Sequence, residues 1–274
     1  MPARSGYSCH VQQPLRSVFH VVLRPYVVQV LSWAPFSERR PCAGVRVSES
    51  HGAVVNVAIA MLVFIASHVV IARTGLKPWL TEKLGRRGYL VAYSLLSLAL
   101  LGWVIAALLA APRVAVWPAP EWGWAFAAVV SLLGFVLMGV GAATPNPLSV
   151  AFRSEGFDPE RPGAIGWVRQ PLLLGLTLWA VAHVPANGDW PSLALFGVSG
   201  LFGLLGMFRV GQRKRQQLGP ERWASMTAAP GHLDARALVG ALIGAFLWVV
   251  ALFAHSALFG ANPLAVLRAQ LGLS

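Results

Sequence analysis

Residues 88–111 read GYLVAYSLLSLALLGWVIAALLAA and carry no formal charge. A helix rises about 1.5 Å per residue, so about 20 apolar residues cross the hydrocarbon core of a bilayer, which is about 30 Å thick. Residues 237–260 form a second charge-free run of similar length, and four further stretches resemble these two. We therefore predict an all-α, polytopic membrane protein with about six transmembrane helices, at residues 53–72, 88–111, 122–143, 165–184, 190–208 and 236–259.

The composition excludes a soluble protein and several classes of site. Of the 274 residues 56% are hydrophobic and only 12% are charged, whereas soluble proteins carry about 25% charged residues. The net charge of +12 would suggest nucleic acid in a soluble protein, but here the bases flank apolar spans, so we expect no nucleic-acid partner. The two cysteines, Cys9 and Cys42, are too few for a disulfide framework or a Cys-rich metal site.

The basic residues lie in alternate connections between the predicted spans. The first, third and fifth connections hold fourteen lysines and arginines, whereas the opposite side holds only Arg113 and Arg268 from position 51 onward. Lysine and arginine accumulate in cytoplasmic loops of membrane proteins. The odd-numbered connections are therefore predicted to lie in the cytoplasm, with both ends of the six-helix core on the other side.

Residues 1–50 conflict with this topology, because they would add six arginines to the non-cytoplasmic side. One explanation is a basic targeting leader with a short apolar region at residues 26–33. The other is a reading frame begun too far upstream, with the true start near Val54 or Val57; we favour it because Arg24 and Pro25 interrupt the apolar run. We accordingly predict a disordered leader or misassigned start at 1–50 and a transmembrane domain at 51–274.

Small residues recur at spacings typical of helix contacts in lipid. Gly197, Gly200, Gly203 and Gly206 follow one another at intervals of three, and Gly240 precedes Gly244 by four residues. Without side chains, two helix backbones approach closely, and this favours packing in a bilayer. These glycines are predicted to be structural. The fourth span is the weakest of the six, since its fully apolar part begins only after Pro171.

Histidines are the main candidates for chemistry within the spans. An ionisable group in a bilayer is costly and marks a functional candidate, and the spans contain His68, His183 and His255. The lack of Asp and Glu in the confident spans argues against a carboxylate proton relay or a zinc hydrolase. Histidines from two helices can together ligate one haem iron. The alternative, favoured by spacing alone and most strongly for His255, is an imidazole that bonds to a neighbouring backbone carbonyl.

Several short motifs occur in a distinctive order: SH at 67–68, YSLLSL at 93–98, PNPLS at 145–149, WAVAH at 179–183, ANGD at 186–189, and His255 followed by LFG at 258–260. Their order and spacing resemble those of the NnrU family of bacterial membrane proteins, over residues 58–262. That family is associated by name with nitric oxide and nitrite reduction in denitrifying bacteria. It is also similar to the 15-cis-zeta-carotene isomerase of plants and cyanobacteria, a haem b membrane enzyme.

The resemblance implies an inner-membrane protein with His68 and His183 as ligands of a haem b iron. Two residues depart from the relatives: Gln170 stands where the family usually has histidine, and Ala180 stands where the isomerase has cysteine. From the helix ends we expect about 12 Å between the depths of His68 and His183, at 1.5 Å per residue. One haem iron can then bind both histidines only if the fourth helix begins well below the membrane surface. Otherwise one of the two histidines binds the iron, or neither does.

Three functions are compatible with this sequence, and whether the protein is an enzyme stays open. The first is a haem b protein linked to nitric oxide or nitrite metabolism. The second is a cofactor-free assembly or regulatory factor for a respiratory or denitrification complex, whose basic loops contact anionic lipid or a partner. The third is a haem-dependent isomerase of a polyene. In each case the lipid bilayer is the surrounding partner.

Overall fold

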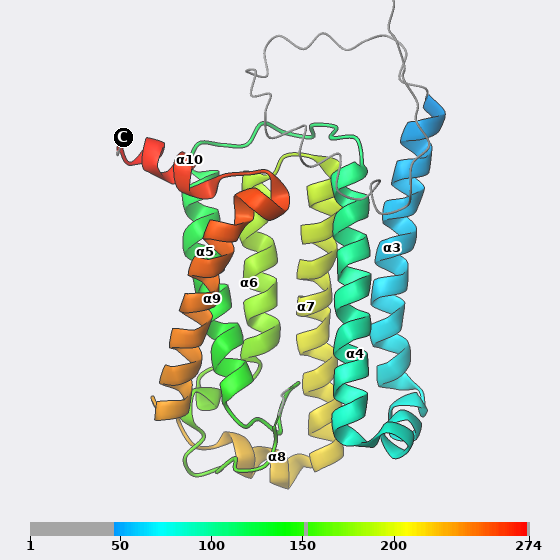
Figure 1. Ribbon diagram of the computed structural model, residues 1–274. Helices are drawn as coiled ribbons and strands as arrows, with labels where there is room; N and C mark the ends of the chain where they lie inside the picture. Colours follow the sequence, from blue (N-terminus) through cyan, green and yellow to red (C-terminus); the bar gives the residue numbers. More distant parts are fainter. Residues whose placement is uncertain (1–46, 151–152, 273–274) are drawn as a thin grey trace, which may run out of the picture. The chain divides into compact units, whose positions relative to one another are not determined.

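Long helices make up most of the computed structural model, which describes residues 47–150 and 153–272 (Figure 1). The leader hypothesis for residues 1–50 falls almost entirely on residues outside this range and stays a prediction. The elements in chain order are α3 (Val47–Arg73), α4 (Leu76–Ala110), α5 (Gly123–Ala143), the 3-10 helix η2 (Gly163–Gly166), α6 (Pro171–Ala186), α7 (Trp190–Leu218), α8 (Pro220–Thr227), α9 (Ala235–Phe259) and α10 (Pro263–Gln270).

The helices agree with the six predicted spans in number and order. Five of them, α3, α4, α5, α7 and α9, are long and apolar enough to cross a membrane. The remaining helix, α6, is the fourth along the chain; it is apolar but has only 16 residues, a length of about 24 Å. Successive spans alternate in direction, so one end of the bundle carries α8 and the other carries α10 (Figure 1). We call these the α8 end and the α10 end.

The fourth predicted span, 165–184, is wrong at its beginning. The helix starts at Pro171 and runs to Ala186, and residues 163–166 form a separate 3-10 turn. Gln170 has φ −132° and ψ 60°, which is not helical, and proline favours the first helical position because its missing N–H would have no partner there. The residues before Pro171 therefore approach the helix as irregular chain.

Two of the predicted connections are largely helical. The basic residues Lys77, Lys83 and Arg86 lie on α4, which already begins at Leu76 and bends at Gly85, where φ is 70°. Likewise α7 continues to Leu218, well beyond the predicted end at 208, and carries the basic run at 213–215 on its last turns. Charged side chains end an apolar run in the sequence, but they do not end a helix once it has left the lipid.

Glycines bring α5 into close contact with two neighbours. A Cβ on Gly134 would lie 2.8 Å from the carbonyl oxygen of Gly175 in α6, and a Cβ on Gly244 of α9 would lie 2.9 Å from the Cα of Val136. The structural role predicted for Gly240 and Gly244 is thus confirmed. On α7, Gly200, Gly203 and Gly206 face α6, whereas Gly197 has no neighbour within 4 Å of its Cβ position. Residues three apart on a helix point about 60° away from each other, so four glycines at this spacing cannot all face the same neighbouring helix.

The pair formed by α3 and α4 packs against α7 near the α10 end. The buried cluster there contains Val57, Ala60, Val104, Ala107, Leu108 and Ala111, with Trp190 and Leu195 of α7 packed against it. The indole nitrogen of Trp190 also donates to the carbonyl of Pro112 at 2.8 Å. Many large apolar side chains on the long helices point outward, among them Leu95, Phe208 and Phe253, at 62%, 67% and 69% exposed. Such faces suit contact with lipid rather than water.

Candidate functional site

His183 lies near the last turn of α6, at the α10 end. Its Nδ1 atom is 2.7 Å from the carbonyl oxygen of Trp179, so Nδ1–H donates and Nε2 carries the free lone pair. The imidazole stacks on the ring of Phe196 of α7, with centroids 4.7 Å apart and planes 20° apart, and Trp179 flanks it at 5.3 Å. The ring is therefore held in one tautomer between two aromatic side chains.

His68 lies near the other end of its helix, α3, toward the α8 end. Its Nδ1 atom is 2.8 Å from the carbonyl oxygen of Phe64. The imidazole is surrounded by Phe64 at 4.6 Å, Tyr93 of α4 at 5.6 Å and Phe202 of α7 at 6.4 Å, measured between ring centroids. Its Nε2 is again the nitrogen left to bind a metal. His68 thus has the same backbone anchor as His183 but different neighbours.

The structure does not bring these two imidazoles together. His183 contacts Phe196 and His68 lies beside Phe202, and these two phenylalanines are six residues apart on α7. Six residues correspond to about 9 Å along a helix axis and to about 120° around it. The two histidines therefore lie at different depths and on different faces of α7, and ligation of iron by either one stays a prediction.

His255, on which the sequence reasoning placed least weight, also lies at the α10 end. Its Nδ1 atom is 3.2 Å from the carbonyl oxygen of Ala261, and its ring lies 4.9 Å from that of Phe259. The α9 helix ends at Gly260 with φ 73°, a left-handed conformation that glycine adopts without strain. This turn brings the carbonyl of Ala261 back to His255, so the LFG motif is explained by the helix end.

The PNP motif and Gln170 connect α5, α6 and α7 toward the α8 end. Asn146 is 1% exposed; its amide donates to the carbonyl of Arg169 at 2.8 Å and its side-chain oxygen accepts from the N–H of Leu148 at 2.9 Å. Gln170 donates to the carbonyl of Met207 in α7 at 2.8 Å. The sequence analysis did not single out Asn146. Its position between two prolines, where few backbone N–H groups are available, was the signal for a side chain that bonds to the backbone.

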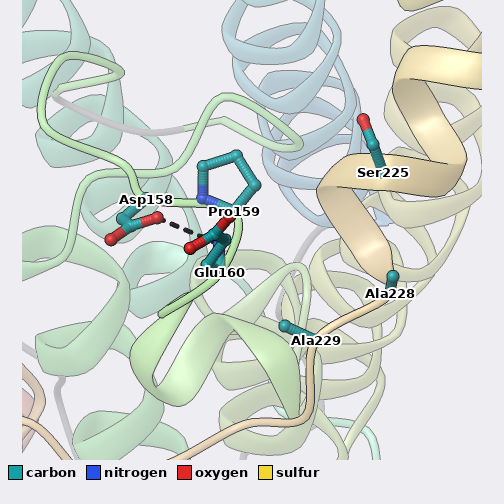
Figure 2. A pocket seen from close by; sticks show the side chains of 6 residues that line it. All are labelled: Asp158, Pro159, Glu160, Ser225, Ala228 and Ala229. Carbon is teal, nitrogen blue, oxygen red and sulfur yellow. Dashed lines mark hydrogen bonds between the residues drawn. The ribbon is translucent and has the colours of Figure 1, made fainter.

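Two cavities of the described residues have no histidine among the residues that line them. The larger, of about 620 Å³, is lined by Asp158, Pro159, Glu160, Ser225, Ala228 and Ala229 at the α8 end (Figure 2). A smaller one, of about 260 Å³, lies between α9 and α10. Within residues 47–150 and 153–272, no group of three His, Cys, Asp or Glu side chains is placed to hold a metal ion. Within the described residues, a site at His68 or His183 would therefore draw on at most two side chains of these four types.

The donor set at His183 fits an iron porphyrin better than a bare ion. A haem iron needs only one or two axial ligands from the protein, and neutral imidazole is a common one. An Nδ1–H bond to a backbone carbonyl is the usual way in which a protein orients such a ligand. The aromatic side chains of Trp179 and Phe196 offer apolar surface beside it.

The comparisons with known proteins agree with the motifs. A family model described as NnrU protein matches residues 56–263, nearly the range over which the motifs resemble that family. No curated protein and no solved structure matches the chain. Because the matched range covers well over half of the sequence, the chain belongs to the NnrU family.

Proposed function

We propose that this multi-pass membrane protein binds haem b, with His183 as an axial ligand of the iron. The observation that carries the proposal is the state of the His183 ring, whose Nδ1 is fixed by the carbonyl of Trp179 while Nε2 stays available. The ring also stacks on Phe196 inside the helix bundle, so its orientation is set before any ligand binds. Preorganised ligands of this kind bind iron with little loss of side-chain entropy.

The family name suggests where such a haem would act. Bound haem would supply an iron that cycles between the ferrous and ferric states and can take a small gas ligand such as nitric oxide. We therefore propose a role linked to nitric oxide or nitrite metabolism, beside a respiratory or denitrification complex. A haem-dependent polyene isomerase would use the same ligand, but Ala180 leaves it without the cysteine found in the carotene isomerase.

The competing proposal is a cofactor-free assembly or regulatory factor. It is favoured by one observation, namely that the rings of Trp179 and Phe196 already pack against the His183 imidazole. In that case the Nδ1 bonds of His68 and His183 are purely structural, and the helices act through their contacts with a partner complex.

We also propose that the protein lies in the bacterial inner membrane with its α8 end in the cytoplasm. Fourteen of the sixteen lysines and arginines from position 51 onward belong to the connections at this end. Excess basic residues remain on the cytoplasmic side during membrane insertion. The His183 end of α6 would then lie near the periplasmic side.

The visible spectrum of the full chain, purified in mild detergent from haem-replete cells, tests the haem proposal. We expect a Soret band that is lost in His183→Ala. The matched control is His232→Ala, which removes a histidine outside the spanning helices and should leave the band unchanged. A colourless preparation of the unaltered chain would rule out haem and favour the cofactor-free factor.

A further inference from the structure

A cavity of about 260 Å³ lies between the end of α9 and the short helix α10, and we call it the α9–α10 cleft. Its α9 wall includes Leu252 and Ser256, its α10 wall includes Leu264 and Arg268, and Asn262 lines it at the turn between the helices. Residues four apart lie on one face of a helix. The cleft is therefore formed by one face of α9 and one face of α10.

The position of α10 is fixed at both of its ends. After α9 the chain turns at Gly260, and Asn262 caps α10 by accepting from the N–H of Ala265 at 3.0 Å. At the other end of α10 the side-chain amide of Gln270 donates to the carbonyl of Glu121, just before α5. Consequently α10 lies across the end of the bundle instead of extending away from it (Figure 1).

The polar side chains of the cleft are hydrogen-bond donors. Arg268 provides a guanidinium group and Ser256 a hydroxyl, and the amide of Asn262 can also donate because only its oxygen caps α10. No acidic residue lines the cleft, and within residues 47–150 and 153–272 Arg268 forms no ion pair. A cation with further donors and no acid beside it favours an anion, and arginine pairs especially well with phosphate.

The apolar part of the cleft lies deeper in the membrane than the polar part. Leu252 and Phe253 come three to four residues before Ser256 on α9, about 4.5–6 Å nearer to the middle of the bilayer. From Phe253 an apolar stripe continues along the exposed side of α9 through Phe246 and Leu242, at 65% and 63% exposed. These intervals of seven and four residues keep the stripe on one side of the helix. Apolar surface therefore leads from the polar groups into the bilayer.

The volume of the cleft suits a headgroup but not a whole lipid. Pockets that enclose a complete small-molecule ligand measure about 300–1,000 Å³, and the cleft is smaller, at about 260 Å³. A phospholipid needs only its phosphate inside, because its acyl chains stay in the bilayer. A zwitterionic headgroup would place a second positive charge beside Arg268, and the cleft has no acid to offset it.

We propose that the α9–α10 cleft binds an anionic phospholipid from the leaflet at the α10 end. Arg268 and Ser256 hold the headgroup phosphate, and an acyl chain follows the apolar stripe of α9. The bound headgroup fastens α10 to α9, because it contacts both helices. This site is separate from the proposed haem, since no histidine lines the cleft.

Photo-crosslinking of the full chain in nanodiscs tests the site. The nanodiscs contain phosphatidylcholine and a small fraction of phosphatidylglycerol with a photoactivatable group on one acyl chain, and peptide mapping locates the cross-links. We expect cross-links within residues 242–268 of the unaltered chain. In Arg268→Gln their yield at limiting lipid should fall by about tenfold, because hydrogen bonds between charged groups are the strong ones.

Two controls separate the cleft from general attraction to basic residues. Arg113→Gln removes the other base on this side of the membrane, which already pairs with Asp189 at 3.1 Å, and should leave the yield unchanged. Cross-links to the basic run at 213–215 give an internal standard at the α8 end. A phosphatidylcholine probe with the same photoactivatable group should label the cleft only weakly.

Several outcomes would overturn the proposal. Equal labelling of the cleft by the two lipid probes would mean that it does not select an anionic headgroup. An unchanged yield in Arg268→Gln, or an equal fall in Arg113→Gln, would remove Arg268 as the binding group. Loss of the cross-links on addition of excess glycerol phosphate would make the ligand a soluble phosphate ester. None of these results affects the Soret band that tests the haem proposal.

Discussion

Replacing Gly134 by alanine tests the close packing of α5 on α6, on which the position of His183 depends. A Cβ at this position would lie 2.8 Å from the carbonyl oxygen of Gly175 and 3.1 Å from the backbone nitrogen of Trp179. Both neighbours are backbone atoms and cannot rotate away. The two helices must separate by about 0.6 Å before the shorter distance reaches the range of ordinary contact, and a close-packed interior resists such a shift.

The expected cost can be worked out from two opposing effects. Overpacking of a well-packed interior costs about 1–3 kcal/mol, while alanine gains up to about 1 kcal/mol over glycine in helix propensity. Taking about 2 kcal/mol for the first effect and about 1 kcal/mol for the second, Gly134→Ala should lower the free energy of unfolding by about 1 kcal/mol, a factor of about 5 in the ratio of folded to unfolded protein.

Thermal unfolding of the detergent-purified variants measures this effect. The matched control is Gly197→Ala on α7, the same chemical change at a position with no neighbour within 4 Å of the Cβ. Its midpoint should equal or slightly exceed that of the unaltered chain, whereas that of Gly134→Ala should fall. Equal midpoints for the two variants would refute the close contact between α5 and α6.

Three further predictions concern the ends of the helices. Asp189→Ala should cost about 1 kcal/mol of stability, because the Asp189 carboxylate caps α7 by accepting from the N–H of Ser192 at 3.0 Å. Asp189→Asn should keep most of this stability, since asparagine caps a helix as well as aspartate does. The ion pair that Asp189→Asn removes, with the half-exposed Arg113, contributes less than about 1 kcal/mol. Asn146→Ala should cost about 1–3 kcal/mol in the same thermal assay, because the buried N–H of Leu148 and the partly buried carbonyl of Arg169 lose their partner. A reporter enzyme fused after residue 215 should be active only in the cytoplasm, and periplasmic activity there would contradict the proposed orientation.

Helix number and order could be predicted because they depend on a one-dimensional property, the length of apolar runs. The beginning of α6 could not be predicted, because apolar residues before Pro171 belong to the separate 3-10 helix at 163–166, where Ile165 is buried without being part of α6. Similarly, the four basic residues within 209–215 end the apolar run but not α7, since arginine and lysine are good helix formers in water.

The candidate site was harder to predict than the fold, because it depends on which helices are neighbours. Trp179 and His183 are four residues apart, a spacing that places both on one face of a helix, and their ring centroids are 5.3 Å apart. Nothing in the spacing showed that α6 and α9 both pack on α5. The register of these helices followed from contacts such as those of Gly134 with Gly175 and of Gly244 with Val136.

The bend at Gly85 divides α4 into a short first segment and the long apolar span (Figure 1). That segment exposes Trp79 and Leu84, at 53% and 51%, and carries Lys77 and Lys83. Tryptophan and lysine both favour the headgroup region, where an apolar body and a polar tip are solvated together. The segment can thus act as an interfacial anchor that sets how deeply the α3 and α4 pair sits in the membrane. In a thinner or thicker bilayer, the α3 and α4 pair would keep its depth relative to the headgroups. The contacts between this pair and α7 would then shift to match the new bilayer thickness.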